Sequence, residues 1–553
     1  MKDLRDLILK HALLNAVEHE GKANVQAVLG KVIAEVPEVK DRISKIIKNI
    51  QLIVTEVNKM NLDSQKEMIK QTGAKKIEKK VKETSELHEL PNAKIGKVVT
   101  AFPPEPSKYP HLGHAKAALI NFLYAKKYKG KFVLRFEDSN PELAKKEYYE
   151  EIISGLNWLG IKWNKIDYLS DHLPQYYKAV ESLIKKNNAY VCLCRQEVIK
   201  YKRMAGEICE HREQSVKENL KLWKDMLKKF KPGQATVRMK IDMQHQNTTM
   251  RDPSIMKISD MSHPRTGKKY RVWPLYDFAT ALMDAWEKIT HRVRTKEFEL
   301  RADLQEFIRS SLGFPSPVII EMGRFQIKDA LTQGRMIREM IAKKEILGWD
   351  DPRLTTLIAL KRRGFVPEAI CDFLLSTGLT KAESEIEWGA IEAYNRKKID
   401  SVANRYFTVL NPTKIKIDNA PKIKEVKILM HPDFPKRGRR KLPVDTQKIY
   451  IEDDDYKKFR EKNVGLISLF TTTISAPAKF VSNEIPYDLQ KIQWISEPNA
   501  KLKIVMPDGS TKTGVGEINM KKLKVGQLIQ LVRVGFCRVD KINKDIVLYY
   551  AHK

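Results

Sequence analysis

Cysteine and long apolar runs are both scarce in this chain. Five of its 553 residues are cysteine, and three of them fall in one short stretch, which excludes a disulfide framework. No apolar run reaches the roughly 20 residues that cross a bilayer. The charged N-terminus, MKDLRDLILK, has no apolar core followed by a small-residue cleavage site. We therefore expect a soluble cytoplasmic protein with no membrane partner.

Acidic residues are too few to balance the basic ones. Lys and Arg number 101 against 69 Asp and Glu, which leaves a net charge of +32 and a pI near 9.6. Such an excess favours a polyanionic partner, because neutralised phosphates release counterions. A generally lysine-rich proteome is the alternative explanation for this excess. With 42% hydrophobic residues, the chain can build the cores of about three to five domains.

The first 72 residues have almost no proline and show a helical pattern. Apolar side chains such as Leu4, Leu7, Ile8 and Leu14 recur at spacings of three and four residues. The following stretch, Lys75–Glu83, has little apolar content and is predicted to be a solvated helix end or linker. We place a domain boundary near residue 92.

From Gly96 the pattern changes to alternating strands and helices. Val98, Val99 and Phe102 indicate a buried strand, a helix is expected over about 113–128, and Lys131–Phe136 indicates a second strand. A further helix is expected over about 147–159. Strand, crossover helix and strand form the parallel unit of a doubly wound sheet, which binds ligands at the carboxyl ends of its strands.

The last third of the chain, from about Tyr406, is different again. Short alternating runs such as LISLF, KLKIVM, LIQLVRV and DIVLYY are separated by Pro, Gly, Asn and Asp. This pattern is typical of a β-barrel or β-sandwich.

The most informative motif is FPPEPSKYPHLGHAKAAL, from Phe102 to Leu119. His111 and His114 flank Gly113 where the predicted strand turns into a helix. The N-terminus of a helix binds anions through free backbone N–H groups, and imidazole N–H groups can stabilise charge that develops on a phosphate. Histidines that cap a helix or lie on the surface are the alternative for an isolated HxGH.

Together with LRFEDSNP (Leu134–Pro141), this segment resembles the nucleotide-binding half of the class I glutamyl- and glutaminyl-tRNA synthetases. HPRTGKKYRVWPLYDFA (His263–Ala279) and GWDDPRLTTLIALKRRGF (Gly348–Phe365) resemble later parts of the same catalytic domain. MPDG, VGFCRVD and YYAHK resemble the paired anticodon-binding barrels, and KANVQAVLGKV resembles the N-terminal helices of the archaeal glutamyl type. The resemblance covers essentially the whole chain.

The resemblance implies a multidomain α/β protein with a class I Rossmann catalytic domain. The expected parts are an N-terminal helical domain (1–92), the first Rossmann half (93–190), an acceptor-end insert (191–262), the second Rossmann half (263–330), a signature loop with a helical connector (331–404), and paired anticodon-binding β-barrels (405–553). The implied reaction joins glutamate to tRNA(Glu) through an adenylate, with ATP as substrate and Mg²⁺ as its partner.

The resemblance also implies roles for individual residues. His111, Gly113 and His114 are expected to bind ATP, with Arg335 and Arg338 as its candidate phosphate ligands. Glu105, Glu137, Tyr276 and Arg294 are expected to bind the amino acid, with Glu137 on its ammonium group and Arg294 on its γ-carboxylate.

The clustered cysteines indicate a metal site. Cys192-x-Cys194 and Cys209-x-His211 supply three thiolates and an imidazole, a set suited to tetrahedral Zn²⁺. Reduced cysteines beside a surface histidine are the alternative. In the resembling family such a structural zinc site favours glutamate over glutamine. Cys371 and Cys537 are isolated and are expected to be core residues.

The sequence departs from the family pattern in four places. Ala101 replaces an arginine, Lys108 replaces a turn glycine, and Met283 before Asp284 replaces one of two acidic residues, with Ala285 in place of a histidine. The loop over 330–338, ALTQGRMIR, puts Met336 at the expected phosphate-binding lysine; Arg335 or Arg338 could supply the charge instead.

These departures leave two functions open. One is a working glutamate–tRNA ligase, and the other is a synthetase-derived paralogue that binds tRNA but has lost or altered aminoacylation. A glutaminyl enzyme is a third alternative. Charging of tRNA(Gln) besides tRNA(Glu) also stays open, and a monomer is what the family implies.

Overall fold

The computed structural model describes residues 2–18, 21–36, 43–71 and 87–553. It divides into two compact units, Met1–Thr84 and Ser85–Lys553. The predicted solvated helix end or linker over 75–83 lies outside the described residues. Among the helices that the structure describes, none combines the length and apolar character needed to span a membrane.

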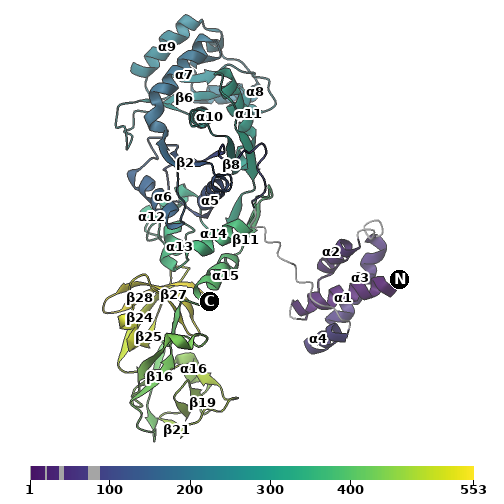
Figure 1. Ribbon diagram of the computed structural model, residues 1–553, viewed down its shortest axis with the longest axis vertical. Coiled ribbons are helices and arrows are strands. Elements are labelled where there is room, and N and C mark those ends of the chain that lie inside the picture. The colour runs from purple at the N-terminus through teal and green to yellow at the C-terminus, as the bar shows by residue number, and fades with distance from the viewer. Residues whose placement is uncertain (1, 19–20, 37–42, 72–86) are drawn as a thin grey trace. The chain divides into compact units, whose positions relative to one another are not determined.

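The described part of the first unit is helical, as its sequence pattern predicts, and is purple in Figure 1. Its helices are α1 (Lys2–Glu18), α2 (Val25–Glu35), α3 (Ile43–Asn58) and α4 (Leu62–Gln71). Apolar side chains from one face of each of α1, α2 and α3 form its core, among them Leu13, Val28 and Ile50. The unit therefore has a core of its own.

The second unit contains the predicted parallel sheet. Strands β1 (Val99–Phe102), β2 (Lys131–Phe136) and β3 (Lys165–Tyr168) pair in parallel, and the helices α5 (Leu112–Lys127) and α6 (Lys146–Trp158) form the crossovers. The parallel pair β8 (His291–Thr295) and β9 (Val318–Met322) lies beside β1, because the amide of Thr290 donates to the Val99 carbonyl at 3.0 Å. The doubly wound arrangement places the carboxyl ends of β1, β2 and β8 at one edge.

An inserted segment lies between the two halves of this sheet region. Its antiparallel sheet has the order β4 (Ala189–Cys192), β5 (Thr236–Met239), β6 (Ser254–Ile258) and β7 (Val272–Pro274). Helices α7 (Leu173–Lys185), α8 (Gln196–Ala205), α9 (Val216–Lys228), α10 (Tyr276–Trp286) and α11 (Ala302–Ser311) accompany it. The fully buried Trp223 and Trp273 anchor its core.

Short helices connect the parallel-sheet region to the C-terminal strands. They are α12 (Gly334–Ala342), α13 (Leu357–Arg363), α14 (Pro367–Ser376) and α15 (Trp388–Ile399), with the strand pair β10 (Phe325–Ile327) and β11 (Ser384–Ile386). Arg362 on α13 forms a bidentate bond to Asp540, with both distances 3.0 Å, and Arg363 donates to the Ala551 carbonyl at 2.8 Å. These contacts fix the connector on the C-terminal strands.

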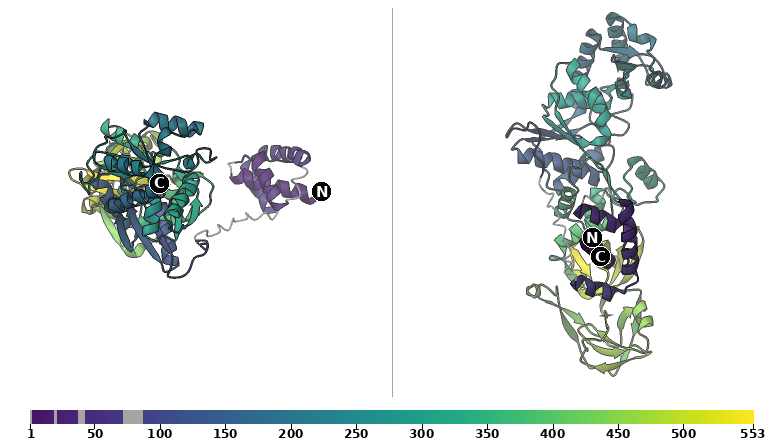
Figure 2. Two further views of the ribbon diagram at one scale, coloured as in Figure 1. Left: turned by 90° about the horizontal axis from the view of Figure 1, so that it is seen from above. Right: turned by 90° about the vertical axis from the view of Figure 1, so that its right-hand side faces the viewer.

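The C-terminal third is β-structure, as the alternating runs predict. One seven-stranded sheet has the order β12 (Asn404–Tyr406), β26 (Leu528–Leu531), β27 (Gly535–Ile542), β28 (Ile546–His552), β24 (Asn499–Val505), β25 (Thr511–Glu517) and β13 (Thr408–Leu410). Smaller sheets contain β14 (Pro412–Ile415), β15 (Ile417–Asp418), β16 (Glu425–Leu429), β17 (Arg439–Pro443), β18 (Ile449–Glu452), β19 (Asn463–Leu466), β20 (Phe470–Thr473), β21 (Ala478–Ser482), β22 (Lys491–Ile492) and β23 (Ile495–Ser496), with helix α16 (Asp453–Lys458). Figure 2 shows these strands, green to yellow, gathered at the end of the second unit away from the insert.

The separate core of the first unit leads to a stability prediction. We expect residues 1–84, expressed alone, to unfold cooperatively as a helical domain. Replacing the fully buried Ile50 with Ala should lower its free energy of unfolding by about 2–5 kcal/mol, because the methyl groups leave a cavity. Leu52→Ala is the control, since this side chain on the same helix is 64% exposed and should change stability by less than about 0.5 kcal/mol. Urea unfolding followed by circular dichroism measures both; equal effects would contradict the packing.

Candidate active site and metal centre

The HxGH turn lies directly after β1 and forms the N-terminus of α5. His111 is the N-cap of this helix, and its Nδ1 accepts a hydrogen bond from the Gly113 amide at 3.0 Å. The two imidazole rings stack with their centroids 4.0 Å apart. A Cβ atom at Gly113 would lie 2.9 Å from the His111 ring, so this glycine leaves the space in which the ring folds over the helix end. The motif therefore presents both imidazoles at a helix N-terminus.

The second sequence block, 348–365, packs against this turn. The Leu112 amide donates to the Thr355 carbonyl at 3.3 Å, and the Leu357 amide donates to the Pro110 carbonyl at 2.8 Å. Two segments about 240 residues apart in sequence are thereby joined as a short backbone ladder. This pairing explains why both blocks are needed to form one site.

The histidines open into a cavity of about 640 Å³, a volume typical of ligand sites. Seven of the predicted site residues line it: Glu105, His111, Gly113, His114, Glu137, Tyr276 and Arg294. The tertiary structure thus brings together seven of the nine residues predicted for ATP and for the amino acid.

Arg335 and Arg338 are not among the residues that line this cavity. Arg335 is exposed on α12 and pairs with Glu339 at 2.9 Å. Arg338 donates to the Ser107 carbonyl at 2.8 Å, which ties α12 to the turn that precedes His111. Their role as phosphate ligands stays a prediction.

A buried charge network fixes the acidic side of the cavity. Arg135, fully buried at the end of β2, donates to Glu137 at 2.9 Å, to Asp284 at 2.9 Å and to Glu287 at 2.8 Å. Thr280 on α10 also donates to Glu137, through the same oxygen, Oε1, at 2.5 Å. The other oxygen, Oε2, has no hydrogen-bond partner among the described residues. Glu137 is therefore held in place with one carboxylate oxygen unused.

Two arginines of β8 form the basic side. Arg294 donates to Gln305 at 2.8 Å and to the Phe298 carbonyl at 3.1 Å, but its buried Nε has no partner. Arg292 also lines the cavity and donates to Asp284 and to Thr280, at 2.5 and 3.0 Å. Burial alone would raise the pKa of Asp284, but Arg292 and Arg135 hold it below its ordinary value. Asp284 is therefore charged at neutral pH.

Two of the departures from the family pattern lie outside the cavity lining. Ala101 is buried against Val133 and Ile289, and Met283 is buried in the core beneath α10. Lys108, in contrast, lines the cavity, as does Thr332 from the loop over 330–338. A ligand in the cavity would therefore meet the changed loop and turn, and not Ala101 on β1 or Met283 on α10.

Sequence reasoning missed Arg292, Lys116 and Arg324 as lining residues. Arg292 could have been found, because residues two apart on a strand point to the same face and Arg294 was already a candidate. Lys116 and Arg324 carried no comparable signal, since their positions depend on how α5 and β10 meet.

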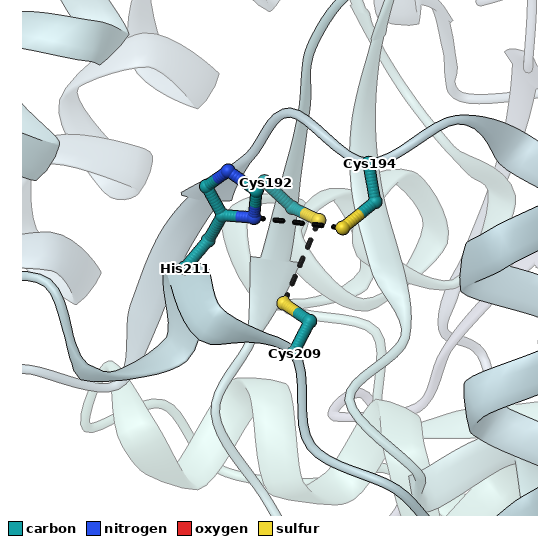
Figure 3. Close-up of side chains that lie close together, drawn as sticks. All are labelled: Cys192, Cys194, Cys209 and His211. Carbon is teal, nitrogen blue, oxygen red and sulfur yellow. Dashed lines mark hydrogen bonds between the residues drawn. The ribbon is translucent and has the colours of Figure 1, made fainter.

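The predicted metal ligands converge at the end of β4 (Figure 3). The ligand atoms of Cys192, Cys194, Cys209 and His211 lie within 4.8 Å of one another. Tetrahedral Zn²⁺ with bonds of about 2.3 Å to sulfur and about 2.0 Å to nitrogen would place two sulfurs about 3.8 Å apart and sulfur and nitrogen about 3.5 Å apart. The Cys192–Cys209 sulfurs are 3.8 Å apart, and Cys194 Sγ lies 3.5 Å from His211 Nδ1. The donor set therefore fits zinc in kind and in spacing.

The surroundings of Cys209 favour negative charge on its sulfur. The guanidinium of the fully buried Arg238 lies 3.7 Å from Cys209 Sγ. The hydrogen bond from the Cys192 thiol lowers the pKa of Cys209 to about 4, with Tyr190, His211 and Arg238 acting in the same direction. A thiolate, the form that binds metal, is thus already favoured at Cys209, whereas the hydrogen bond to Cys209 raises the pKa of Cys192 and burial raises that of Cys194.

The histidine pair leads to a prediction about pH. Burial lowers the pKa of His114 to about 3 and that of His111 well below its ordinary value, so both rings are neutral at pH 7. Below pH 6.5 these histidines bind protons in the unfolded chain but not in the folded protein. The free energy of unfolding therefore falls as pH falls. We expect His114→Gln to gain stability relative to wild type between pH 7 and 5, measured by thermal unfolding. His88→Gln, at an exposed residue, should show no such pH-dependent difference; equal behaviour of both variants would contradict the assignment.

Comparison with known proteins identifies the families whose domains resemble these regions. Residues 97–401 match the model for tRNA synthetases class I (E and Q), catalytic domain, and residues 403–489 and 487–540 match two models for the anti-codon binding domain of the same group. A glutamate tRNA ligase structure from Elizabethkingia meningosepticum aligns over 56% of this chain and 70% of that chain, at 17% identity and a TM-score of 0.42, a value too low to support a detailed comparison.

Curated archaeal proteins match the chain over its full length. "Glutamate--tRNA ligase" of Pyrococcus furiosus is 39% identical, and that of Pyrococcus horikoshii is 41% identical, each over 100% of both chains. The chain therefore belongs to the class I tRNA synthetases of the E and Q group, together with these archaeal glutamate–tRNA ligases.

Proposed function

We propose that this protein joins L-glutamate to the 3′ end of tRNA(Glu) with ATP, through a glutamyl-adenylate. The carrying observation is one cavity in which the HxGH turn lies beside both acidic and basic side chains, among them Glu105, Glu137, Arg292 and Arg294. Glutamate is a small molecule with one ammonium and two carboxylate groups, and ATP is a polyanion, so this set of charges suits both. The full-length match to glutamate–tRNA ligases supports the same assignment.

The first step needs positioning and charge stabilisation. An oxygen of the glutamate α-carboxylate attacks the α-phosphorus of ATP, the bond to the pyrophosphate oxygen breaks, and pyrophosphate leaves with the electron pair. Neutral His111 and His114 rings can donate N–H bonds to phosphate oxygens at the N-terminus of α5. Mg²⁺ would enter with ATP and neutralise phosphate charge, and Glu105 supplies a carboxylate on the cavity wall.

Side-chain atoms that lack a hydrogen-bond partner in the described structure would orient the amino acid. Oε2 of Glu137 can accept from the substrate ammonium, while Arg135 and Thr280 hold Oε1. The unpartnered Nε of Arg294 is a buried donor, which costs free energy until an acceptor arrives. A substrate carboxylate would satisfy it, and we therefore assign the γ-carboxylate to Arg294, with Tyr276 packing beside it.

In the second step a ribose hydroxyl at the tRNA 3′ end attacks the glutamyl carbonyl carbon and AMP leaves. The net charge of +32 suits a polyanionic RNA. We assign the insert over 191–262 to the acceptor end and residues 405–553 to the anticodon, in line with the two anticodon-binding family models.

We further propose that the Cys192, Cys194, Cys209 and His211 cluster holds a structural Zn²⁺. It would join β4 to the Cys209–His211 turn, where α8 contributes no buried side chain to a core. A metal would replace the packing that this short segment lacks.

Aminoacylation tests the function directly. We expect the wild-type protein to charge archaeal tRNA with labelled glutamate, and Arg294→Gln to lower kcat/KM for glutamate about a hundredfold, because a charge-assisted bond to the γ-carboxylate is lost. Arg294→Lys should be intermediate, since it keeps the charge but not the geometry. Tight tRNA binding without charging would favour the paralogue, and preferential charging of glutamine would favour the glutaminyl alternative. Purified tRNA(Glu) and tRNA(Gln), assayed separately, decide whether both are substrates.

Metal analysis tests the zinc site. We expect the purified protein to contain about one zinc per chain by elemental analysis, because the four donors match tetrahedral coordination. Cys209→Ser should lose the metal and lower the melting temperature. Cys371→Ser is the matched control, since Cys371 lies outside the cluster. Zinc retained in full by Cys209→Ser would refute the ligand set.

A further inference from the structure

The cavity around the histidine pair contains two lysines without an acidic partner. Lys108 and Lys116 both line it, and neither forms an ion pair within the part of the chain that the structure describes. Lys116 is 4% exposed, and its Nζ lies 5.3 Å from the centre of the Phe325 ring. Burial lowers the pKa of Lys116 to about 8 and also lowers that of Lys108, where Arg324 adds repulsion. An ammonium group that is largely removed from water and has few acceptors is costly, and an anion in the cavity would relieve that cost.

The loop over 330–338 contacts Lys108 and positions its side chain in the cavity. Its Nζ makes one long hydrogen bond, 3.5 Å, to the Thr332 carbonyl. Its stem lies on Gly334, the first residue of α12: a Cβ atom there would be 3.1 Å from Lys108 Cδ and 3.3 Å from its Cβ. The bond from Arg338 to the Ser107 carbonyl holds α12 against the same turn. Gly334 therefore leaves the space that the lysine stem occupies.

The loop itself brings little charge into the cavity. Its sequence over 330–338 contains no lysine, Arg335 is paired with Glu339 in solvent, and Arg338 is engaged with backbone. Besides Arg292 and Arg294, the cations that line the cavity are Lys108 from the turn after β1, Lys116 from α5 and Arg324 from the loop before β10. Two lysines and an arginine on fixed elements thus surround a space beside the α5 N-terminus.

We propose that Lys108 and Lys116 bind the polyphosphate of ATP from the scaffold side of the cavity, and that Gly334 is the positioning residue that admits Lys108. This inference rests on the proposed function, since ATP is the substrate which that function assigns. The phosphate-binding charge would then lie on the rigid turn and on α5 and not on the loop over 330–338. Gly334 in that loop would provide the space for the Lys108 stem.

Calorimetric titration of the full-length protein with inorganic tripolyphosphate, and separately with Mg²⁺–ATP, tests this. We expect Lys108→Met and Lys116→Met each to weaken binding of both ligands about tenfold to a hundredfold, the loss typical of one charge-assisted contact. Lys131→Met is the matched control, because this exposed lysine lies at the opposite end of β2 from the site, and it should bind as wild type does. Lys108→Arg, which keeps the charge, should lose less than Lys108→Met.

The geometry also predicts a rescue. Gly334→Ala should weaken binding several-fold by displacing the Lys108 stem. The double variant Lys108→Gly with Gly334→Lys returns an ammonium to the loop, and should bind tripolyphosphate more tightly than Lys108→Gly alone. A lysine that only stabilised the fold would give no such recovery. Unchanged melting temperatures would show that the variants are folded.

The outcomes separate this inference from the proposed function. Wild-type charging of tRNA together with unchanged ATP affinity in both lysine variants would overturn the assignment of the lysines and leave the function standing. Lysine-dependent tripolyphosphate binding without glutamate charging would support the lysines as polyphosphate ligands and refute the function. A wild-type protein that binds neither polyphosphate would overturn the inference outright.

Discussion

The active-site region depends on one buried cation, Arg135. Its guanidinium is removed from water at the end of β2 and bonds to Glu137, Asp284 and Glu287, so it joins the first half of the parallel sheet to α10 in the second half. A buried ion left without its partner costs about 3–5 kcal/mol, and this penalty holds the two halves in one arrangement. The same bonds orient Glu137 toward the cavity, so the interaction that fixes the fold also sets the charge of the site.

The rest of the cavity is lined by neutral hydrogen-bond donors and by cationic side chains. Burial keeps the stacked histidines neutral, so each ring has one N–H group that can donate a hydrogen bond at a helix end. Net positive charge comes from residues on other elements, including Lys108, Arg292 and Arg294. Because these groups are preorganised before any ligand arrives, they need not reorganise when charge develops on a phosphate. The changed loop over 330–338 contributes shape through Gly334 and Thr332.

Local sequence patterns were sufficient for much of this description. The strand Lys131–Phe136 was predicted with the bounds that the structure has, because four of its six residues are apolar and turn signals flank it. The helix that begins at the HxGH motif was placed to within one residue, because Gly113 and the following alanines and leucine fix its start and apolar face. The four metal-ligand candidates met as predicted, since short CxC and CxH spacings constrain each pair locally.

Sequence alone thus determined the element types, the parallel strand units, the helical and β-rich regions at either end of the chain and the chemical character of the candidate residues. These depend on periodicity, capping and turn residues, which act over a few positions. Only the tertiary structure decided that Ala101 and Met283 pack away from the cavity, that Arg335 and Arg338 stay outside its lining, and that Lys108, Lys116 and Arg292 enter it. Such placements depend on contacts between elements up to hundreds of residues apart, because side-chain burial is set by what packs opposite, which no local pattern records.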